Sequence, residues 1–254
     1  MTVQIDDALL DPLVEAETLL VALDFDGTLA PFEKDPADSR MVPAAAEALA
    51  ELREAPGVAL ALVSGRAVES LTAAARPAEG DYLAGSHGLE IREPGEKLRL
   101  LAPEEALQRR DALHDVLHSV VSGVPDAWVE SKPAGFAVHT RALSEQAAEE
   151  LGDRAAAAVV ARGIPASSRR GNGVREFALA EADKGQAIEH FRRVVGADAV
   201  LFAGDDVTDE DGFAVMGLRD LGVKVGEGRT RARARVASPG ELAALLLRIK
   251  KLRS

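Results

Sequence analysis

The chain has 254 residues, which suits one large domain or two smaller ones. It contains 47% hydrophobic and 28% charged residues, and its net charge of -12 disfavours nucleic acid or an anionic membrane as a partner. The absence of cysteine excludes disulfides, thiolate zinc sites and cysteine nucleophiles. The N-terminus is acidic, and no apolar run approaches the ~18 residues that span a bilayer, so we expect a soluble cytoplasmic protein.

Short apolar runs alternate with helical segments in the first part of the chain. The run TLLVALDF is rich in Leu and Val, as expected for a strand that is buried on both faces of a sheet. The order strand, helix, strand, helix, strand predicts a parallel sheet with right-handed crossovers. In chain order, we expect a strand over 18–25, a helix over 42–55, a strand over 58–65, a helix over 66–75 and a strand over 81–91.

The middle of the chain has a different pattern, in which each helix is followed by two short strands. Such a unit does not continue a parallel sheet, so we expect a separate αββαββ domain over residues 93–181. Ser144 is the expected N-cap of its second helix. The expected elements are a helix over 103–121, strands over 126–133 and 135–141, a helix over 144–163, and strands over 164–170 and 173–180.

The last part returns to alternating helices and buried strands, with Thr208 placed to cap a short helix. Residues 1–92 and 182–254 should therefore form one domain around the insertion. The predicted fold class is α/β, with a Rossmann-like parallel sheet core, helices on both faces and an inserted αββαββ unit. The expected elements are a helix over 184–195, a strand over 199–206, helix over 208–217, strand over 221–226 and helix over 238–252.

Acidic and hydroxyl side chains follow several of the predicted strands. In a parallel α/β sheet, ligands bind beyond the carboxyl ends of the strands, so residues far apart in sequence should meet in one crevice. Lys184 begins a helix at the same edge. The strand-end residues are Asp24 and Asp26, then Ser64, then Asp205, Asp206 and Asp209.

Asp24 and Asp26 fit two interpretations. They are turn residues that cap the backbone, or they face one ligand, because positions i and i+2 of a strand point to the same side. Two close carboxylates repel and shift each other's pKa, and they are tolerable when a divalent cation lies between them. The segment GDDVTDED also fits two interpretations. It is the exposed acidic start of a helix, or it contributes Asp205 as a metal ligand. Carboxylates without nearby His or Cys suit Mg²⁺ better than zinc.

Ser64 and Lys184 also fit two interpretations each. Ser64 in LVSGR is a turn hydroxyl, or it contacts a phosphate oxygen together with the N–H of Gly65 at a helix start. Taken alone, Lys184 is interpreted as a surface lysine. Beside the acids, it becomes a counter-charge for a phosphate and a nucleophile.

Four motifs in order, DFDGT, VSGR, a lysine before a helix and GDDxxxD, resemble those of the haloacid dehalogenase superfamily of phosphatases. The segments LDFDGTLAPF, LVSGRAVESL, AGSHGLEI, VESKPAGFAVHTR, DKGQAI and GDDVTDEDGF resemble the trehalose-6-phosphate phosphatase family within it. These segments span both predicted domains, so the resemblance goes beyond a shared fold. The segment ALAEAD before Lys184 is less basic than is usual in that family.

The resemblance implies a Mg²⁺-dependent phosphatase that hydrolyses trehalose 6-phosphate through an aspartyl-phosphate, with the inserted unit as a cap. It makes Asp24 the nucleophile, and Asp26 the general acid and then the base. The implied metal ligands are Asp24, the backbone carbonyl of Asp26, and Asp205. Asp209 is expected close to the metal, and Asp206 behind the residues that bind it. The implied phosphate ligands are Ser64, Lys184 and the N–H groups of Gly27 and Gly65.

The resemblance also implies that Glu130 and Lys132 of the cap contact sugar hydroxyls, with Glu176 as a further candidate. From the residues alone, Glu130 and Lys132 read as a solvent-facing pair on a hairpin edge. Arg66 and His87 are expected at the mouth of the core site, as substrate contacts or as structural hydrogen-bonding residues. His139 and Arg141 alternate along the predicted hairpin, and we expect them to be packing or rim residues.

Other functions remain open on the sequence. The same core suits a capped phosphatase for sucrose phosphate or a pseudo-disaccharide phosphate, or a phosphomutase. A catalytically silent sugar-phosphate-binding partner of a trehalose-making glycosyltransferase should lack the nucleophile or a metal acid, and this chain has them. We expect a monomer that is functionally coupled to a trehalose-6-phosphate synthase. Four alternating arginines form a basic stripe, which is more typical of a solvated face than of a nucleic-acid site. They are Arg229, Arg231, Arg233 and Arg235.

Overall fold

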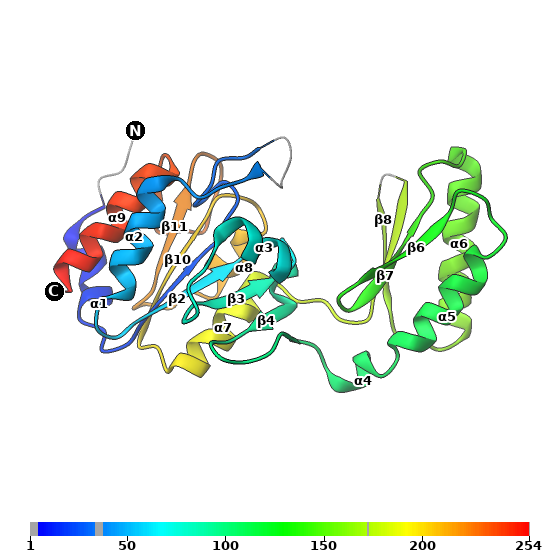
Figure 1. Ribbon diagram of the computed structural model, residues 1–254, viewed down its shortest axis with the longest axis horizontal. Helices are drawn as coiled ribbons and strands as arrows, with labels where there is room; N and C mark the ends of the chain where they lie inside the picture. The colour runs from blue at the N-terminus through cyan, green and yellow to red at the C-terminus, as the bar shows by residue number, and fades with distance from the viewer. Residues whose placement is uncertain (1–4, 34–37, 172, 254) are drawn as a thin grey trace. The chain divides into compact units, whose positions relative to one another are not determined.

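The computed structural model describes residues 5–33, 38–171 and 173–253. These residues form two compact units. The core unit contains the described residues up to Arg99 and from Ala182 onward, and the cap unit spans Leu100–Glu181 (Figure 1). Within the described ranges, no helix is both long enough and apolar enough to cross a membrane.

The core unit is built on an eight-stranded sheet in the order β12-β11-β10-β1-β2-β3-β4-β5. Neighbouring strands from β12 to β3 run parallel, and β4 pairs antiparallel with β3. Every residue of β1 is buried, which is why this central strand is apolar on both faces. The strands are β1 (Leu19–Leu23), β2 (Val58–Val63), β3 (Tyr82–Gly85), β4 (Glu90–Arg92), β5 (Arg99–Leu100), β10 (Ala199–Gly204), β11 (Leu221–Val225) and β12 (Ala234–Val236).

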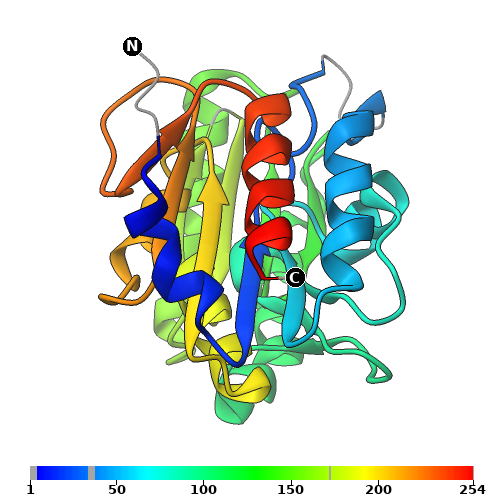
Figure 2. The ribbon, with the colours of Figure 1, turned by 90° about the vertical axis from the view of Figure 1, so that its left-hand side faces the viewer.

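Helices cover both faces of this sheet, as the sequence pattern predicts. On one face, α2 and α9 lie against each other, and α1 and α3 belong to the same buried apolar cluster (Figure 2). On the other face, α7 and α8 pack against the sheet and against each other. Phe213 of α8 contacts Phe202 of β10, with ring centroids 5.2 Å apart. The helices are α1 (Asp7–Val14), α2 (Pro43–Arg53), α3 (Val68–Ala75), α7 (Lys184–Val195), α8 (Asp209–Ala214) and α9 (Pro239–Leu252).

Some expected elements are interrupted in the structure. The strand expected over 81–91 is two strands, because Ser86 and His87 between them have φ angles of 50° and 58°, which a strand cannot contain. The helix expected over 103–121 is two helices, α4 (Glu104–Leu107) and α5 (Arg110–Val121). Thr208 is the N-cap residue of α8 but makes no side-chain cap bond there.

The cap unit contains a four-stranded antiparallel sheet in the order β6-β7-β9-β8. Its helices α5 and α6 lie on one face of this sheet (Figure 1), and Ser144 caps α6 as expected, by accepting the N–H of Ala147. Phe136, Val138 and Phe177 bury their side chains on the helical face. The elements are β6 (Trp128–Lys132), β7 (Gly135–His139), α6 (Glu145–Ala161), β8 (Ser167–Gly171) and β9 (Val174–Ala178).

The arginine stripe before and within β12 has local structural partners. Arg233 donates hydrogen bonds to the carbonyl oxygens of Leu218 and Asp220, 3.2 Å away in each case. Arg235 donates to the carbonyl oxygens of Gly226 and Gly228. Carbonyls at strand and loop ends need such donors, so these two arginines tie the edge strand to its neighbouring loops.

Candidate active site

A cavity of about 360 Å³ opens in the core unit at the carboxyl ends of the central strands. Parallel strands that end at one edge bring these residues together from distant parts of the chain. Gly27 and Asp209, also predicted in the site, are not among the lining residues. The lining consists of Asp24, Asp26, Phe32, Glu33, Ser64, Gly65, Arg66, His87, Lys184, Asp205, Asp206 and Thr208.

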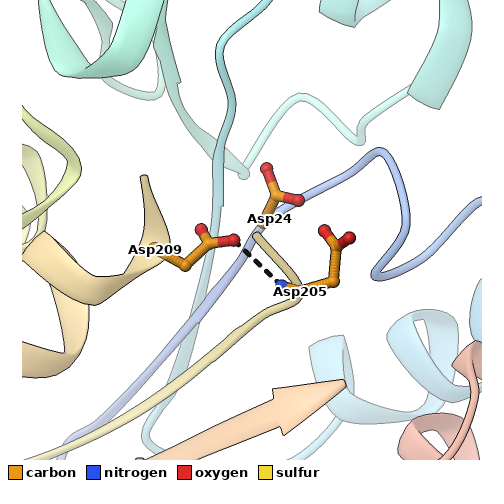
Figure 3. A group of neighbouring side chains, drawn as sticks. All are labelled: Asp24, Asp205 and Asp209. Carbon is orange, nitrogen blue, oxygen red and sulfur yellow. Dashed lines mark hydrogen bonds between the residues drawn. The ribbon is translucent and has the colours of Figure 1, made fainter. Parts of the chain in front are cut away.

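Three carboxylates form a cluster at the base of this site (Figure 3). Asp24 directly follows β1, Asp205 directly follows β10, and Asp209 begins α8. One carboxylate oxygen from each lies within 4.8 Å of the others. Asp24 is 4% exposed and Asp209 is fully buried. The predicted convergence of strand-end acids is therefore present as a set of close, desolvated oxygen donors.

Lys184 is the positive charge inside this cluster. It is the first residue of α7, which Asp183 caps by accepting the N–H of Gln186, and it is only 3% exposed. Its Nζ donates to Asp24 Oδ1 at 2.8 Å and to Asp209 Oδ1 at 2.7 Å. Burial acts to lower the pKa of Lys184, but the two carboxylates outweigh it and raise that pKa. The lysine is therefore held in its charged form.

One lysine does not neutralise the whole cluster. Burial raises the pKa of Asp24 to about 7, against the attraction of Lys184 and with added repulsion from Asp209. Burial, followed by repulsion from Asp209, raises the pKa of Asp205 to about 6. An additional cation would relieve this excess negative charge. The donors are all carboxylate oxygens, so the cluster fits a hard divalent ion such as Mg²⁺.

Neighbouring groups fix the positions of these acids. Thr28 donates from its hydroxyl to Asp24 Oδ2 at 3.2 Å and, as an alternative, to Asp205 Oδ1 at 3.3 Å. Asp209 Oδ2 accepts the backbone N–H groups of Asp205 and Asp206, both at 2.9 Å. Gly27 has φ of 79°, and a Cβ there would collide with the Asp205 carboxylate. The glycine in DFDGT is thus required by close approach as well as by backbone conformation.

Asp26 lies at the same pocket, but its carboxylate faces a different set of partners. Arg66 donates to both of its oxygens at 2.6 Å, and Ser39 donates to Oδ1 at 2.9 Å. Burial acts to raise the pKa of Asp26, but these hydrogen bonds outweigh it and leave the pKa below its usual value. Two acids separated by a single residue therefore have opposite pKa shifts, which is the arrangement expected for different chemical roles.

Ser64 and His87 form another wall of the pocket. Ser64 is buried, and its hydroxyl oxygen accepts the N–H of Arg66 at 3.2 Å. The His87 ring packs over Gly65, where a Cβ would lie 2.7 Å from the imidazole Cε1. Burial, assisted by the charge of Lys184, lowers the pKa of His87, which favours the neutral imidazole. The left-handed backbone at His87 is a strained conformation of the kind that gathers at functional sites.

The predicted sugar-binding residues lie in the cap unit. Glu130 and Lys132 alternate along β6, and Lys132 Nζ donates to Glu130 Oε1 at 2.8 Å. Glu176 on β9 lies in the same cross-strand row as Glu130, with Ala137 of β7 between them. His139, expected as a packing or rim residue, places Nε2 2.7 Å from Glu130 Oε2. Arg141, the other of the two, packs over Gly173.

Several residues that organise the site were missed by sequence reasoning. Thr28 lies inside the motif DFDGT, in which roles were predicted only for the two acids and Gly27. Ser39 stands in a loop without any distinguishing pattern. Lys224 is 4% exposed and donates to the carbonyl oxygen of Asp205. The sequence does indicate a role for Lys224, because a lysine within the apolar strand LGVKV needs a buried partner.

Comparisons with known proteins agree on one family. The family model described as trehalose-phosphatase matches residues 22–237. Trehalose-6-phosphate phosphatase of Escherichia coli strain K12 is 35% identical over 238 residues, covering 89% of this chain and 86% of that protein. The bifunctional trehalose-6-phosphate synthase/phosphatase of Thermoproteus tenax is 33% identical over 249 residues. That match covers 96% of this chain but only 33% of the relative.

A solved structure shares the fold over the whole chain. It is that of Aspergillus fumigatus trehalose-6-phosphate phosphatase, with a TM-score of 0.72 and 21% sequence identity, covering 99% of both chains. The likeness confirms the predicted fold class, a mostly parallel sheet in the core and a separate antiparallel sheet in the cap.

Proposed function

The chain belongs to the trehalose-phosphatase family, and on this basis we propose that it hydrolyses trehalose 6-phosphate to trehalose and inorganic phosphate. The family prediction made from the motifs is thereby confirmed. The observation that carries the proposal is the contact of Lys184 with Asp24 in the core pocket. A carboxylate that can attack phosphorus lies beside a fixed positive charge that can hold a phosphoryl oxygen.

We assign the first half of the reaction to Asp24 and Asp26. An oxygen of Asp24 attacks phosphorus, the bond from phosphorus to the sugar oxygen breaks, and an aspartyl-phosphate forms. Asp26 is ionised in the free protein, so it first takes up a proton from solvent and then gives that proton to the departing sugar oxygen. Because both Asp26 oxygens accept hydrogen bonds, this step requires Arg66 to release one of them. Arg66 lines the pocket, so its guanidinium can transfer a hydrogen bond to the substrate.

In the second half, water attacks the phosphorus atom of the aspartyl-phosphate. Asp26 takes a proton from that water, the bond between phosphorus and Asp24 breaks, and phosphate leaves. The pKa of Asp26 lies below its usual value, so its carboxylate is ionised at neutral pH and available as the base. Asp24 is regenerated as a carboxylate against Lys184, ready for another substrate.

The phosphoryl oxygens are assigned to a short list of donors. Ser64 and Lys184 line the pocket, and the N–H of Gly65 lies at the same wall. The N–H of Gly27 donates to the carbonyl oxygen of Ala30 at 2.7 Å, so its predicted phosphate contact requires that turn to rearrange. Lys184 is the charged donor among these groups, so it supplies the strongest electrostatic stabilisation of the four.

We assign a Mg²⁺ site to the acid cluster. The ligands would be the carboxylates of Asp24, Asp205 and Asp209 and the backbone carbonyl of Asp26. When bound, Mg²⁺ supplies positive charge that offsets the carboxylates and the charge developing on the phosphoryl group. Asp209 is fully buried and does not line the pocket, so its direct share in coordination is smaller than that of Asp24 or Asp205.

The proposed division of labour separates chemistry from sugar recognition. In this proposal residues 1–92 and 182–254 are the hydrolase core and residues 93–181 the cap, whereas the compact cap unit of the structure begins at Leu100. Glu130, Lys132 and Glu176 bind sugar hydroxyls on the cap sheet, whereas Arg66 and His87 approach the substrate from the core pocket. Adjacent strands lie about 4.8 Å apart, so Glu130 and Glu176, two strands apart, flank a bed roughly 10 Å wide over Ala137.

The proposed cellular setting follows the substrate. Trehalose 6-phosphate must be supplied by a synthase, and the Thermoproteus tenax relative is a bifunctional synthase/phosphatase. We therefore propose functional coupling of this chain to a trehalose-6-phosphate synthase. A monomeric state and a cytoplasmic location remain predictions.

Phosphate release measured across a panel of sugar phosphates tests the proposed function. With Mg²⁺ present, the wild-type protein should release phosphate fastest from trehalose 6-phosphate, ahead of sucrose 6-phosphate and glucose 6-phosphate. Asp24→Asn should lower kcat at least a thousandfold on every substrate, because an amide cannot form the aspartyl-phosphate. Preference for another sugar phosphate would overturn the substrate assignment. Undiminished activity of Asp24→Asn would overturn the nucleophile.

A further inference from the structure

The single tryptophan of the chain lies half exposed on the edge strand of the cap sheet. Trp128 begins β6 and is 51% exposed. The buried cluster of the cap unit lies on the opposite, helical face, so Trp128 does not contribute to that core. An exposed aromatic on an edge strand favours unwanted pairing with other chains. Its position is better explained by a role than by packing.

Trp128 is stacked on a histidine of the next strand. The two residues face each other directly in the β6–β7 pair. The ring centroids of Trp128 and His139 are 4.6 Å apart, and the ring planes differ by only 6°. Cross-strand aromatic pairs of this kind restrict both side chains, because rotation of either ring breaks the stack. The indole therefore fixes the plane of the imidazole.

The fixed imidazole holds one oxygen of Glu130. His139 Nε2 lies 2.7 Å from Glu130 Oε2, while Lys132 Nζ lies 2.8 Å from Glu130 Oε1. Each carboxylate oxygen accepts two hydrogen bonds, so Glu130 retains one free lone pair on each oxygen. Two neighbouring sugar hydroxyls can donate to these lone pairs. The Glu130 side chain is 42% exposed and lies, like Trp128, on the face of the sheet opposite the helices, which we call the open face.

We propose that Trp128 is a positioning residue for sugar recognition, which acts by holding His139 in the orientation that fixes Glu130. The inference rests on the proposed function, in which the cap sheet binds the sugar. A carboxylate fixed before the sugar arrives loses less side-chain entropy on binding than a free one. The expected ligand is a vicinal diol of a pyranose ring.

The opposite face of the indole offers a second way in which Trp128 could act, by stacking directly on a sugar ring. The two routes predict different results in a double-mutant cycle. If Trp128 acts through His139, removing both residues costs no more than removing His139 alone. If the indole touches the sugar itself, the two losses multiply.

The test compares four variants, Trp128→Ala, Trp128→Phe, His139→Phe and the double Trp128→Ala/His139→Phe, on trehalose 6-phosphate and on p-nitrophenyl phosphate. Phe at 128 keeps a stacking ring, whereas Phe at 139 keeps the stack and removes the donor to Glu130. Trp128→Ala and His139→Phe should each raise KM for trehalose 6-phosphate roughly tenfold, the scale of one hydrogen bond to a charged group, with kcat little changed. Trp128→Phe should stay within threefold of wild type. The double variant should match His139→Phe.

Val160→Ala is the matched control, because Val160 is 76% exposed on α6 of the same unit and belongs to no proposed site. It should leave both activities unchanged. A loss in Trp128→Ala that is equal on both substrates, a KM within twofold of wild type, or multiplying losses in the double variant would each overturn the inference. Should the wild-type protein prefer another sugar phosphate, the proposed function fails, and the same cycle on that substrate still decides the role of Trp128.

Discussion

The core site and the cap sheet each hold a lysine against a carboxylate at 2.8 Å, in opposite environments. In the core, the side chains of Lys184 and Asp24 are 3% and 6% exposed. In the cap, the side chains of Lys132 and Glu130 are 44% and 42% exposed. Charges removed from water interact strongly and are costly to leave unpaired, whereas exposed pairs are screened and worth little. The same distance therefore describes two different interactions.

The carboxylate pKa values reflect this difference. Burial raises the pKa of Asp24 to about 7 even though Lys184 touches it. In the cap, hydrogen bonds from Lys132 and then His139 lower the pKa of Glu130, and burial opposes them only weakly. The core thus concentrates negative charge that a cation and a phosphoryl group can exploit. The cap presents an ionised carboxylate that suits neutral hydroxyl donors.

The largest expected effect is on stability and comes from removing each lysine in turn. Lys184→Met leaves Asp24 and Asp209 buried without their cation and should lower the free energy of unfolding by about 3–5 kcal/mol. Lys132→Met should change it by less than about 1 kcal/mol. Urea unfolding followed by far-UV circular dichroism, with Trp128 fluorescence reporting on the cap unit, measures both. Losses of similar size in the two variants would remove the contrast between buried and exposed pairs.

Addition of Mg²⁺ should stabilise the core and not the cap. At a Mg²⁺ concentration one hundred times Kd, the free energy of unfolding of the core should rise by about 2.7 kcal/mol. Asp205→Asn removes one donor of the cluster and should abolish most of this gain. Thermal unfolding with Mg²⁺ and with a chelator measures the effect. An equal gain in wild type and Asp205→Asn would place the stabilising ion elsewhere.

The stabilisation by Mg²⁺ should also depend on pH. The folded-state pKa values of Asp205 and Asp24, about 6 and about 7, lie above the ordinary value of 3.8. Between pH 4 and 7 the folded chain therefore binds more protons at these groups than the unfolded chain. Without metal, their contribution to stability falls as the pH rises through this window. Mg²⁺ competes with those protons, so its stabilising effect should grow from pH 5 to pH 8.

The core site was predictable because its residues are fixed by the ends of regular elements. Asp24, Ser64 and Asp205 each follow a buried strand, and Lys184 begins a helix. Strand order and crossover rules place such positions at one edge of a sheet, whatever the side-chain details. The sequence predicted repulsion between Asp24 and Asp26, but the pKa of Asp24 is raised first by its burial and by Asp209. The pKa of Asp26 is lowered by its hydrogen bonds from Arg66 and Ser39, which the sequence did not predict.

The residues that escaped prediction act across strands or from loops. The contact of His139 with Glu130 depends on the register of the β6–β7 hairpin, which the sequence does not state. Ser39 reaches Asp26 from a loop, and the break between β3 and β4 depends on left-handed backbone at Ser86 and His87. Neither Ser86 nor His87 is glycine, so the sequence pattern predicted one continuous strand there.

The smallest expected effect is the most informative about the cap. Glu130→Ala should lower kcat/KM for trehalose 6-phosphate roughly tenfold, or about 1.4 kcal/mol, and change that for p-nitrophenyl phosphate less than twofold. Glu149→Ala is the matched control, because Glu149 is an exposed acid of the same unit, paired with Arg170 at 2.6 Å. It removes the same charge without touching the open face of the sheet, so it should spare both substrates. If Glu130→Ala and Glu149→Ala behaved alike, the cap would act through its overall charge, and the ordered contact of Glu130 with Lys132 and His139 would have no part in choosing the sugar.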